Sequence, residues 1–181
     1  TGLTTVNAGT LTEGIANALS SGAVTVNGGI FNIGAFSDTV GAITLVNGSI
    51  TGTTGVLTST GYTVSNGTIS AILAGAVPLT KTTTGTVTLS GANTYTGLTT
   101  ISAGTLKLGA AGGAINTPLG TTVAGTVVSA GATLDLNGFT LGTAEALTLN
   151  GTGIGGTAGA LTNSSLTAAT FSGPVTLGSD S

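Results

Sequence analysis

The chain has 181 residues, enough for one ordinary domain, and a formal net charge of −3 at pH 7. Charged residues make up only 4% of it, and Cys, His, Met and Trp are absent. High hydrophobicity with a low net charge excludes a disordered tail, and the scarcity of long uninterrupted apolar runs excludes a protein of membrane-spanning helices. Short β-branched runs interrupted by Gly and Asn instead predict an all-β protein.

A repeat runs through the first hundred positions. Each unit has an apolar residue, two further residues, a Gly, one residue and a second apolar residue, as in Val6-Gly9-Leu11. The glycines recur at a nearly constant interval of ~19 residues, which is typical of a repeat architecture. We expect them to form the corners of a coil, because Gly adopts left-handed backbone conformations without strain. These corner glycines are Gly9, Gly29, Gly48, Gly67, Gly85 and Gly104.

Two ladders of side chains follow from this repeat, because neighbouring side chains on a strand point to opposite faces. The ladder expected to face inward is Val6, Val26, Leu45, Val64, Thr82 and Ile101. The ladder expected to face outward is Thr5, Thr25, Thr44, Thr63, Lys81 and Thr100. Asn-Gly pairs at 27, 47, 66, 137 and 150 suit corners for the same conformational reason.

Stacking of such coils predicts a parallel β-solenoid, since a single coil cannot bury its apolar edge alone. Asn-Gly turns also suit hairpins, but hairpin proteins repeat about every 8–12 residues. The crossover rule predicts a right-handed solenoid of about nine coils with ~19 residues each. We expect residues 1–181 to form one solenoid segment, and the missing initiator Met predicts that it belongs to a longer repetitive chain.

The period loosens after Gly109. The stretch 110–120, AAGGAINTPLG, is the expected loop insertion at one corner. Residues 128–131, VSAG, echo ISAG at 101–104 but lie further along the chain than the repeat predicts. Later strands are expected around the pairs Leu134/Leu136, Leu147/Leu149 and Val175/Leu177.

One stretch also resembles a known family. Residues 89–109 read LSGANTYTGLTTISAGTLKLG, and residues 96–106 share nine of eleven positions with residues 1–11. This stretch resembles the passenger-associated transport repeat, also called the autotransporter-associated β-strand repeat. The resemblance implies a right-handed β-helical passenger region of a secreted bacterial surface protein, with a role in transport and folding of the passenger and none in catalysis.

The residue inventory argues against an enzyme. A hydrolytic triad needs a base, usually His, and zinc sites need Cys or His. Asp135 and Glu145 are the nearest pair of carboxylates in sequence, and we expect them, like Glu13 and Asp38, to be isolated surface charges. The run of residues 151–156 fits G-x-G-x-x-G, but no helix pattern follows it, as a dinucleotide site would require. We therefore expect no catalytic residue, no metal and no cofactor.

The functional hypothesis is a structural stalk or fibre segment at the bacterial cell surface or outside the cell, acting in adhesion, aggregation or matrix. The alternative is a self-stacking subunit of an extracellular filament, and a lower alternative is ice binding through the outward Thr ladder. Expected partners are flanking segments or other copies stacked end to end, with cell-surface or matrix glycans next. Two lysines cannot provide a phosphate-binding surface for nucleic acid, and no segment is expected to be embedded in a membrane.

Overall fold

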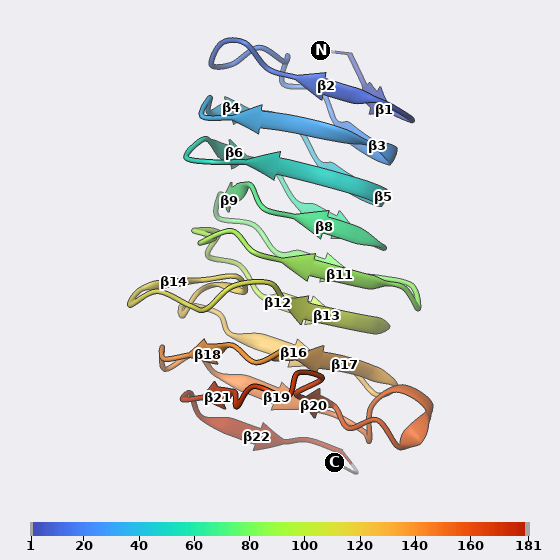
Figure 1. Ribbon diagram of the computed structural model, residues 1–181, viewed down its shortest axis with the longest axis vertical. Coiled ribbons are helices and arrows are strands. Elements are labelled where there is room, and N and C mark those ends of the chain that lie inside the picture. Colours follow the sequence, from blue (N-terminus) through green and yellow to red (C-terminus); the bar gives the residue numbers. More distant parts are fainter. Residues whose placement is uncertain (1, 180–181) are drawn as a thin grey trace.

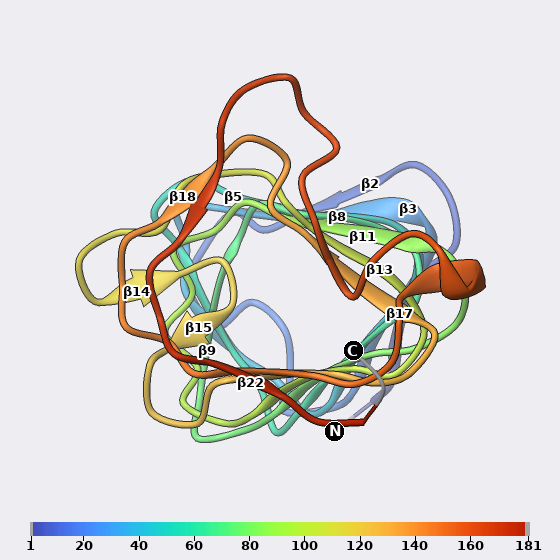
Figure 2. The same cartoon turned by 90° about the horizontal axis from the view of Figure 1, so that it is seen from below.

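The computed structural model describes residues 2–179. It consists of short β-strands stacked in parallel. Residues 1, 180 and 181 of the predicted segment lie outside this description. The coils follow one another along the long axis, and each winds around a common interior in the right-handed sense (Figures 1 and 2). The predicted all-β parallel solenoid is thus confirmed. In the described part of the chain, no helix has the length and apolar character needed to cross a membrane.

Three faces surround the interior. The first face has nine strands in the order β1, β3, β5, β7, β10, β12, β16, β19 and β22. Their bounds are β1 (Thr4–Val6), β3 (Val24–Gly34), β5 (Ile43–Gly52), β7 (Tyr62–Val64), β10 (Leu79–Lys81), β12 (Thr99–Ile101), β16 (Thr126–Val128), β19 (Leu147–Leu149) and β22 (Val175–Leu177).

The second face lies beyond the next corner. Strands β3 and β5 are long enough to pass over that corner and contribute to both faces. The other strands of this face are β2 (Thr10–Thr12), β8 (Gly67–Ile69), β11 (Thr86–Leu89), β13 (Gly104–Leu108), β17 (Ala132–Asp135) and β20 (Leu161–Thr162).

The third face is less regular. Its first part pairs β4 (Asp38–Thr39), β6 (Val56–Thr58) and β9 (Ile72–Ala74), and its last part pairs β18 (Thr140–Leu141) with β21 (Thr170–Phe171). Between them, β14 (Asn116–Thr117) and β15 (Gly120–Thr121) form a small antiparallel hairpin at the end of the stretch 110–120 that was expected as an insertion. A single 3₁₀ turn, η1 (Ile154–Gly156), completes the elements of the described residues.

The stack has about seven turns, slightly fewer than the nine coils expected, although nine strands lie on the first face, because the first and last coils are incomplete in the described residues. The difference arises because the later coils are longer than the first ones. Val6 pairs with Val26 in the first coils, whereas Ile101 pairs with Val128 and Leu149 pairs with Leu177. The hairpin β14–β15 accounts for the first long coil, and the segment that follows β20 contributes to the second (Figure 2).

Aliphatic side chains fill the interior from one end of the stack to the other. Among the described residues, thirty-one apolar residues form one continuous buried cluster. It includes the inward residues of the first face, except Lys81 and Leu177, and a second row on the second face. In that second row, Phe31, Ile50, Ile69, Leu89 and Leu108 are all fully buried. Each coil alone would leave its apolar side in water, so the stacking buries what a single coil cannot.

Glycine corners permit coils to approach closely. A side chain on Gly48 would place its Cβ 2.2 Å from the carbonyl oxygen of Gly29, and one on Gly67 would lie 2.1 Å from that of Gly48. Of the six predicted corner glycines, Gly9, Gly48, Gly67 and Gly104 have the left-handed φ that was the reason for the prediction. Gly29 and Gly85 do not have a left-handed φ; at these two corners, the left-handed residues are Gly28 (φ 110°) and Thr83 (φ 61°).

Asparagines reinforce the same corner on its outer side. The amide of Asn27 donates to Asn7 over 3.3 Å, and that of Asn66 donates to Asn47 over 3.0 Å. Asn27 and Asn47 are register partners between these two pairs. Four successive coils therefore place an Asn at one corner, and the side-chain amides are hydrogen-bonded within the first pair of coils and within the second pair.

Candidate functional site

The first face is the most regular surface of the molecule, and its register corrects one coil of the sequence prediction. Tyr62, Thr63 and Val64 pair with Leu79, Thr80 and Lys81, respectively. The inward residue of this coil is therefore Lys81, which was expected to face outward, and Thr82 does not belong to the inward ladder. The observed inward ladder is Val6, Val26, Leu45, Val64, Lys81, Ile101, Val128, Leu149 and Leu177.

The error came from aligning this coil by Gly85. The corner runs from Val64 to the buried Ile69 in one coil, but from Lys81 to Leu89, the register partner of Ile69, in the next. The second corner contains more residues, so a glycine is a poor reference point there. The usable signal was the motif of an apolar residue, Thr and a third residue, which Tyr62-Thr63-Val64 shares with Leu79-Thr80-Lys81.

Lys81 is fully buried, and its ammonium group closes the widened corner. Its Nζ donates to the carbonyl oxygens of Thr83 (2.8 Å), Ala103 (3.1 Å) and Thr82. Burial lowers the pKa of Lys81 to about 8. Three carbonyls replace the water that the ammonium loses, which explains how a Lys fits between Val64 and Ile101.

The outward ladder presents a row of hydroxyl groups. It consists of Thr5, Thr25, Thr44, Thr63, Thr80, Thr100, Val127, Thr148 and Thr176. Within the described residues, no hydrogen bond of these Thr hydroxyls to another protein group is recorded, so they face solvent. Neighbouring strands lie about 4.8 Å apart, which gives this face a regular polar surface broken only at Val127.

The carboxylates do not lie at the surface as expected. Glu145 is fully buried, and Asp135 is 4% exposed. Glu13 and Asp38 are 5% and 1% exposed. The prediction of isolated surface charges is therefore wrong. Because the chain has only seven charged side chains, these four buried carboxyl groups are most of them.

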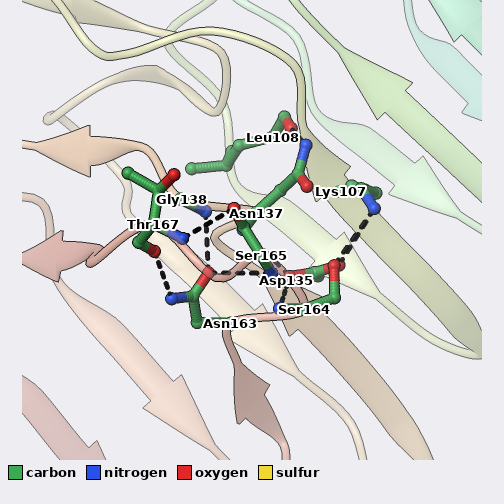
Figure 3. Close-up of polar contacts among 9 residues, drawn as sticks. All are labelled: Lys107, Leu108, Asp135, Asn137, Gly138, Asn163, Ser164, Ser165 and Thr167. Atoms are coloured by element: carbon green, nitrogen blue, oxygen red, sulfur yellow. Dashed lines mark hydrogen bonds and ion pairs between the residues drawn. The ribbon is translucent and has the colours of Figure 1, made fainter.

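Asp135 organises the contact between two coils on the second face (Figure 3). It accepts hydrogen bonds from Ser164 Oγ (2.6 Å), Ser164 N (2.9 Å) and Asn137 N (2.9 Å), and Lys107 Nζ lies 3.6 Å away. Burial alone would raise the pKa of Asp135, but these hydrogen bonds and the Lys107 charge hold it below its usual value. Asn163 continues the cluster by accepting from Gly138 N over 2.7 Å. The cluster fastens the segment after β20 over the outer side of β17.

Glu145 lies beneath the hairpin β14–β15. Its carboxylate accepts hydrogen bonds from the hydroxyls of Thr126 (2.7 Å) and Thr117 (3.2 Å). Burial raises the pKa of Glu145 to about 7, although these two hydrogen bonds act in the opposite direction. The buried amide of Asn93 also donates to Pro118 O over 2.7 Å. The part of the insertion from 117 to 120 is thus held inside the coil, while 113–115 are exposed.

Glu13 and Asp38 form a second buried group, at the N-terminal end of the stack. Burial is the main cause that raises the pKa of Glu13 to about 8, and the neighbouring Asp38 carboxyl adds to it. Asp38 Oδ2 accepts from the backbone N–H of Leu19 over 2.8 Å. Sequence reasoning treated Glu13 and Asp38 as unrelated, because they lie far apart along the chain.

Among the described residues, no three His, Cys, Asp or Glu side chains lie close enough together to hold a metal ion. The glycine-rich run 151–156 contains the η1 turn and borders a shallow depression of about 340 Å³ at the C-terminal end of the stack. Leu149, Leu161 and Leu177 also line this depression, so its surface is mainly apolar.

The two coils from β10 to β13 contain a segment whose sequence matches a known family. Residues 79–108 match the passenger-associated-transport-repeat. This is the family whose resemblance the sequence suggested, and the repeat occupies the middle of the stack, from Leu79 in β10 to Leu108 in β13. No curated protein and no solved structure gives a significant match. The chain therefore carries a structural, passenger-type repeat as part of its β-solenoid.

Proposed function

We propose that the chain is a structural stalk or fibre segment of an extracellular bacterial surface protein, where it acts in adhesion, aggregation or matrix. The observation that carries this proposal is the unbroken first face, in which nine strands stack in parallel from β1 to β22 with the passenger repeat at their centre. A stack of this kind holds its two ends at a fixed separation, which is the mechanical task of a stalk. The family of the repeat supports a surface or extracellular location.

The same proposal assigns no catalytic role to the chain. The sequence has no His or Cys, and the carboxylates of Glu13, Asp38, Asp135 and Glu145 are all buried. A buried carboxylate has no access to a polysaccharide substrate. The inner ladder supplies stability, and the outward Thr row is the surface that we propose for contacts with cell-surface or matrix glycans.

Self-stacking into a filament is the second candidate. In its favour, the last strand of the first face is apolar and uncovered in the described structure: Val175 is 45% exposed and Leu177 is 63% exposed. Another copy stacked on this strand would bury both side chains and fill the adjoining depression. A flanking segment of the same chain would do the same.

Electron microscopy of the purified 181-residue chain separates the two candidates. Separate rods about 40 Å long, the length of nine strands at ~4.8 Å spacing, support a stalk segment. Long unbranched filaments with that axial repeat support the self-stacking subunit. Round particles without an elongated axis would contradict both.

Ice binding through the Thr row makes a separate prediction. The parent chain should inhibit ice recrystallisation, and a Thr44→Ala/Thr63→Ala double variant should lose this inhibition.

A further inference from the structure

Two carboxyl groups meet inside the first two coils, where the described residues offer them no cation. Glu13 directly follows β2, in which Thr12 pairs with Asn32, so Glu13 continues the inward row that Ile33 occupies in the next coil. Asp38 pairs with Leu57 and takes the inward position of β4. Both acidic side chains therefore occupy positions that neighbouring coils fill with buried aliphatic residues.

When Glu13 and Asp38 are both ionised, three of their four carboxylate oxygens lack a hydrogen-bond donor. Glu13 Oε1, Glu13 Oε2 and Asp38 Oδ1 are buried and have no donor. The fourth oxygen, Asp38 Oδ2, accepts from Leu19 N. One added proton on Glu13 supplies a donor for Asp38 and removes one of the two buried charges, so it corrects both defects together.

No other titratable side chain competes for this role. Between residues 2 and 61, Glu13 and Asp38 are the only ionisable side chains. The elements packed against them contribute Ile33 from β3, Leu57 from β6 and the backbone of Leu19. Tyr62 donates its hydroxyl to the carbonyl oxygen of Leu57, the register partner of Asp38. Burial raises the pKa of Tyr62 above its usual value, so this hydroxyl stays neutral.

We propose that a protonated Glu13 donates a hydrogen bond to Asp38, and that this pair is a pH-sensitive latch that fixes the first coil on the second. The pair joins the end of β2, the segment around Leu19 and strand β4. In the described residues, β1 and β2 pair only with β3, and the first coil leaves Leu3 and Ile15 68% and 67% exposed. Val6 belongs to the buried core, and Leu11 and Leu19 are only partly buried against it, so the polar latch adds to a small apolar contact.

The direction of the pH dependence follows from linkage. Glu13 has a raised pKa of about 8 in the closed coil and an ordinary value of 4.5 once the coil opens. Between these two values the closed state holds a proton that the open state has lost, so closing weakens as the pH rises. The opening equilibrium should increase up to about tenfold for each pH unit across this interval and become constant above pH 8.

Hydrogen exchange measured by mass spectrometry on the full chain tests the latch. After correction for intrinsic exchange, peptides from 10–24 should lose protection steadily from pH 5 to pH 8, whereas peptides from 43–58 should not. Glu13→Gln keeps an amide donor toward Asp38 without titrating, so its 10–24 peptides should show no such slope. Glu145→Gln, which removes the other buried Glu with a raised pKa, is the matched control and should keep the slope.

Infrared spectroscopy provides a second readout, which detects the proton on the carboxyl group itself. The C=O stretch of a protonated carboxyl should be present at pH 7 in Glu145→Gln and disappear by pH 9, and it should be absent at pH 7 in a Glu13→Gln/Glu145→Gln double variant. A flat exchange profile in the parent, or an equal slope in Glu13→Gln, would overturn the proposal. Recovery of protection at pH 8.5 on addition of millimolar Ca²⁺, seen in the parent but lost in Glu13→Gln, would also overturn it and assign the pair to a cation.

Discussion

Adjacent residues on strand β5 provide a sharp test of the inward and outward ladders. Leu45 is fully buried between Val26 and Val64 of the neighbouring coils, whereas Thr44 on the same strand points outward. Truncation to Ala at a buried Leu costs about 2–5 kcal/mol, because it removes apolar contacts and leaves a cavity. Truncation at an exposed site without special contacts usually changes stability by less than about 0.5 kcal/mol.

We therefore expect Leu45→Ala to lower the free energy of unfolding by about 2–5 kcal/mol and Thr44→Ala to change it by less than about 1 kcal/mol. Guanidinium denaturation followed by circular dichroism measures both. Since solenoid coils can unfold separately, hydrogen exchange of peptides from 43–52 should be measured alongside. Equal losses in the two variants, or a larger loss in Thr44→Ala, would refute the assignment of the two ladders.

Three further predictions follow from single contacts. Val64→Asp should cost less stability than its position in the core suggests, because it would lie beside Lys81, its register partner in the following coil. Adding Lys81→Met should abolish that compensation, and additive effects of the two changes in a denaturation cycle would contradict it. Gly67→Ala should destabilise by more than about 1 kcal/mol, since its φ is 125° and a Cβ would lie 2.1 Å from the carbonyl oxygen of Gly48 in the preceding coil. Gly61→Ala meets no atom within 4 Å and should be nearly neutral in thermal melts. Glu145, with a pKa raised to about 7 in the folded state, should make the parent lose stability as the pH rises from about 4.5 to 7, and Glu145→Gln should reduce that loss in thermal melts; an unchanged loss would refute the assignment.

The repeated architecture could be predicted from the sequence because the signal recurs. Alternation such as Val24-Thr25-Val26 identifies a strand with one buried face, and its return as Ile43-Thr44-Leu45 identifies the stack. The register between the first four coils and at Ile101 follows from the same motif. These positions share one spacing between the strand and its corner, so a glycine could serve as the reference.

The deviations from that spacing could not be predicted. At Lys81 the corner is wider, and a charged residue takes an inward position that only the register reveals. The meeting of Glu13 with Asp38 depends on the two-residue strand β4, and the burial of Glu145 depends on how the irregular segments of the third face return into the interior. A sequence repeat carries no information on such segments. Composition suggested that rare charges would lie outside, but these charges are buried because neighbouring backbone groups, hydroxyls or a second carboxyl take over their interactions.

Disulfide trapping of neighbouring coils tests the stacked register most directly, because the chain has no Cys of its own. A disulfide requires Cα atoms about 4.4–6.8 Å apart, a range that includes the spacing between paired parallel strands. Thr63 pairs with Thr80, so a Thr63→Cys/Thr80→Cys variant should form an intramolecular disulfide under mild oxidation. A Thr63→Cys/Thr82→Cys variant should not, since Thr82 lies two positions further along. Efficient cross-linking in the second variant, or in neither, would contradict the solenoid as described.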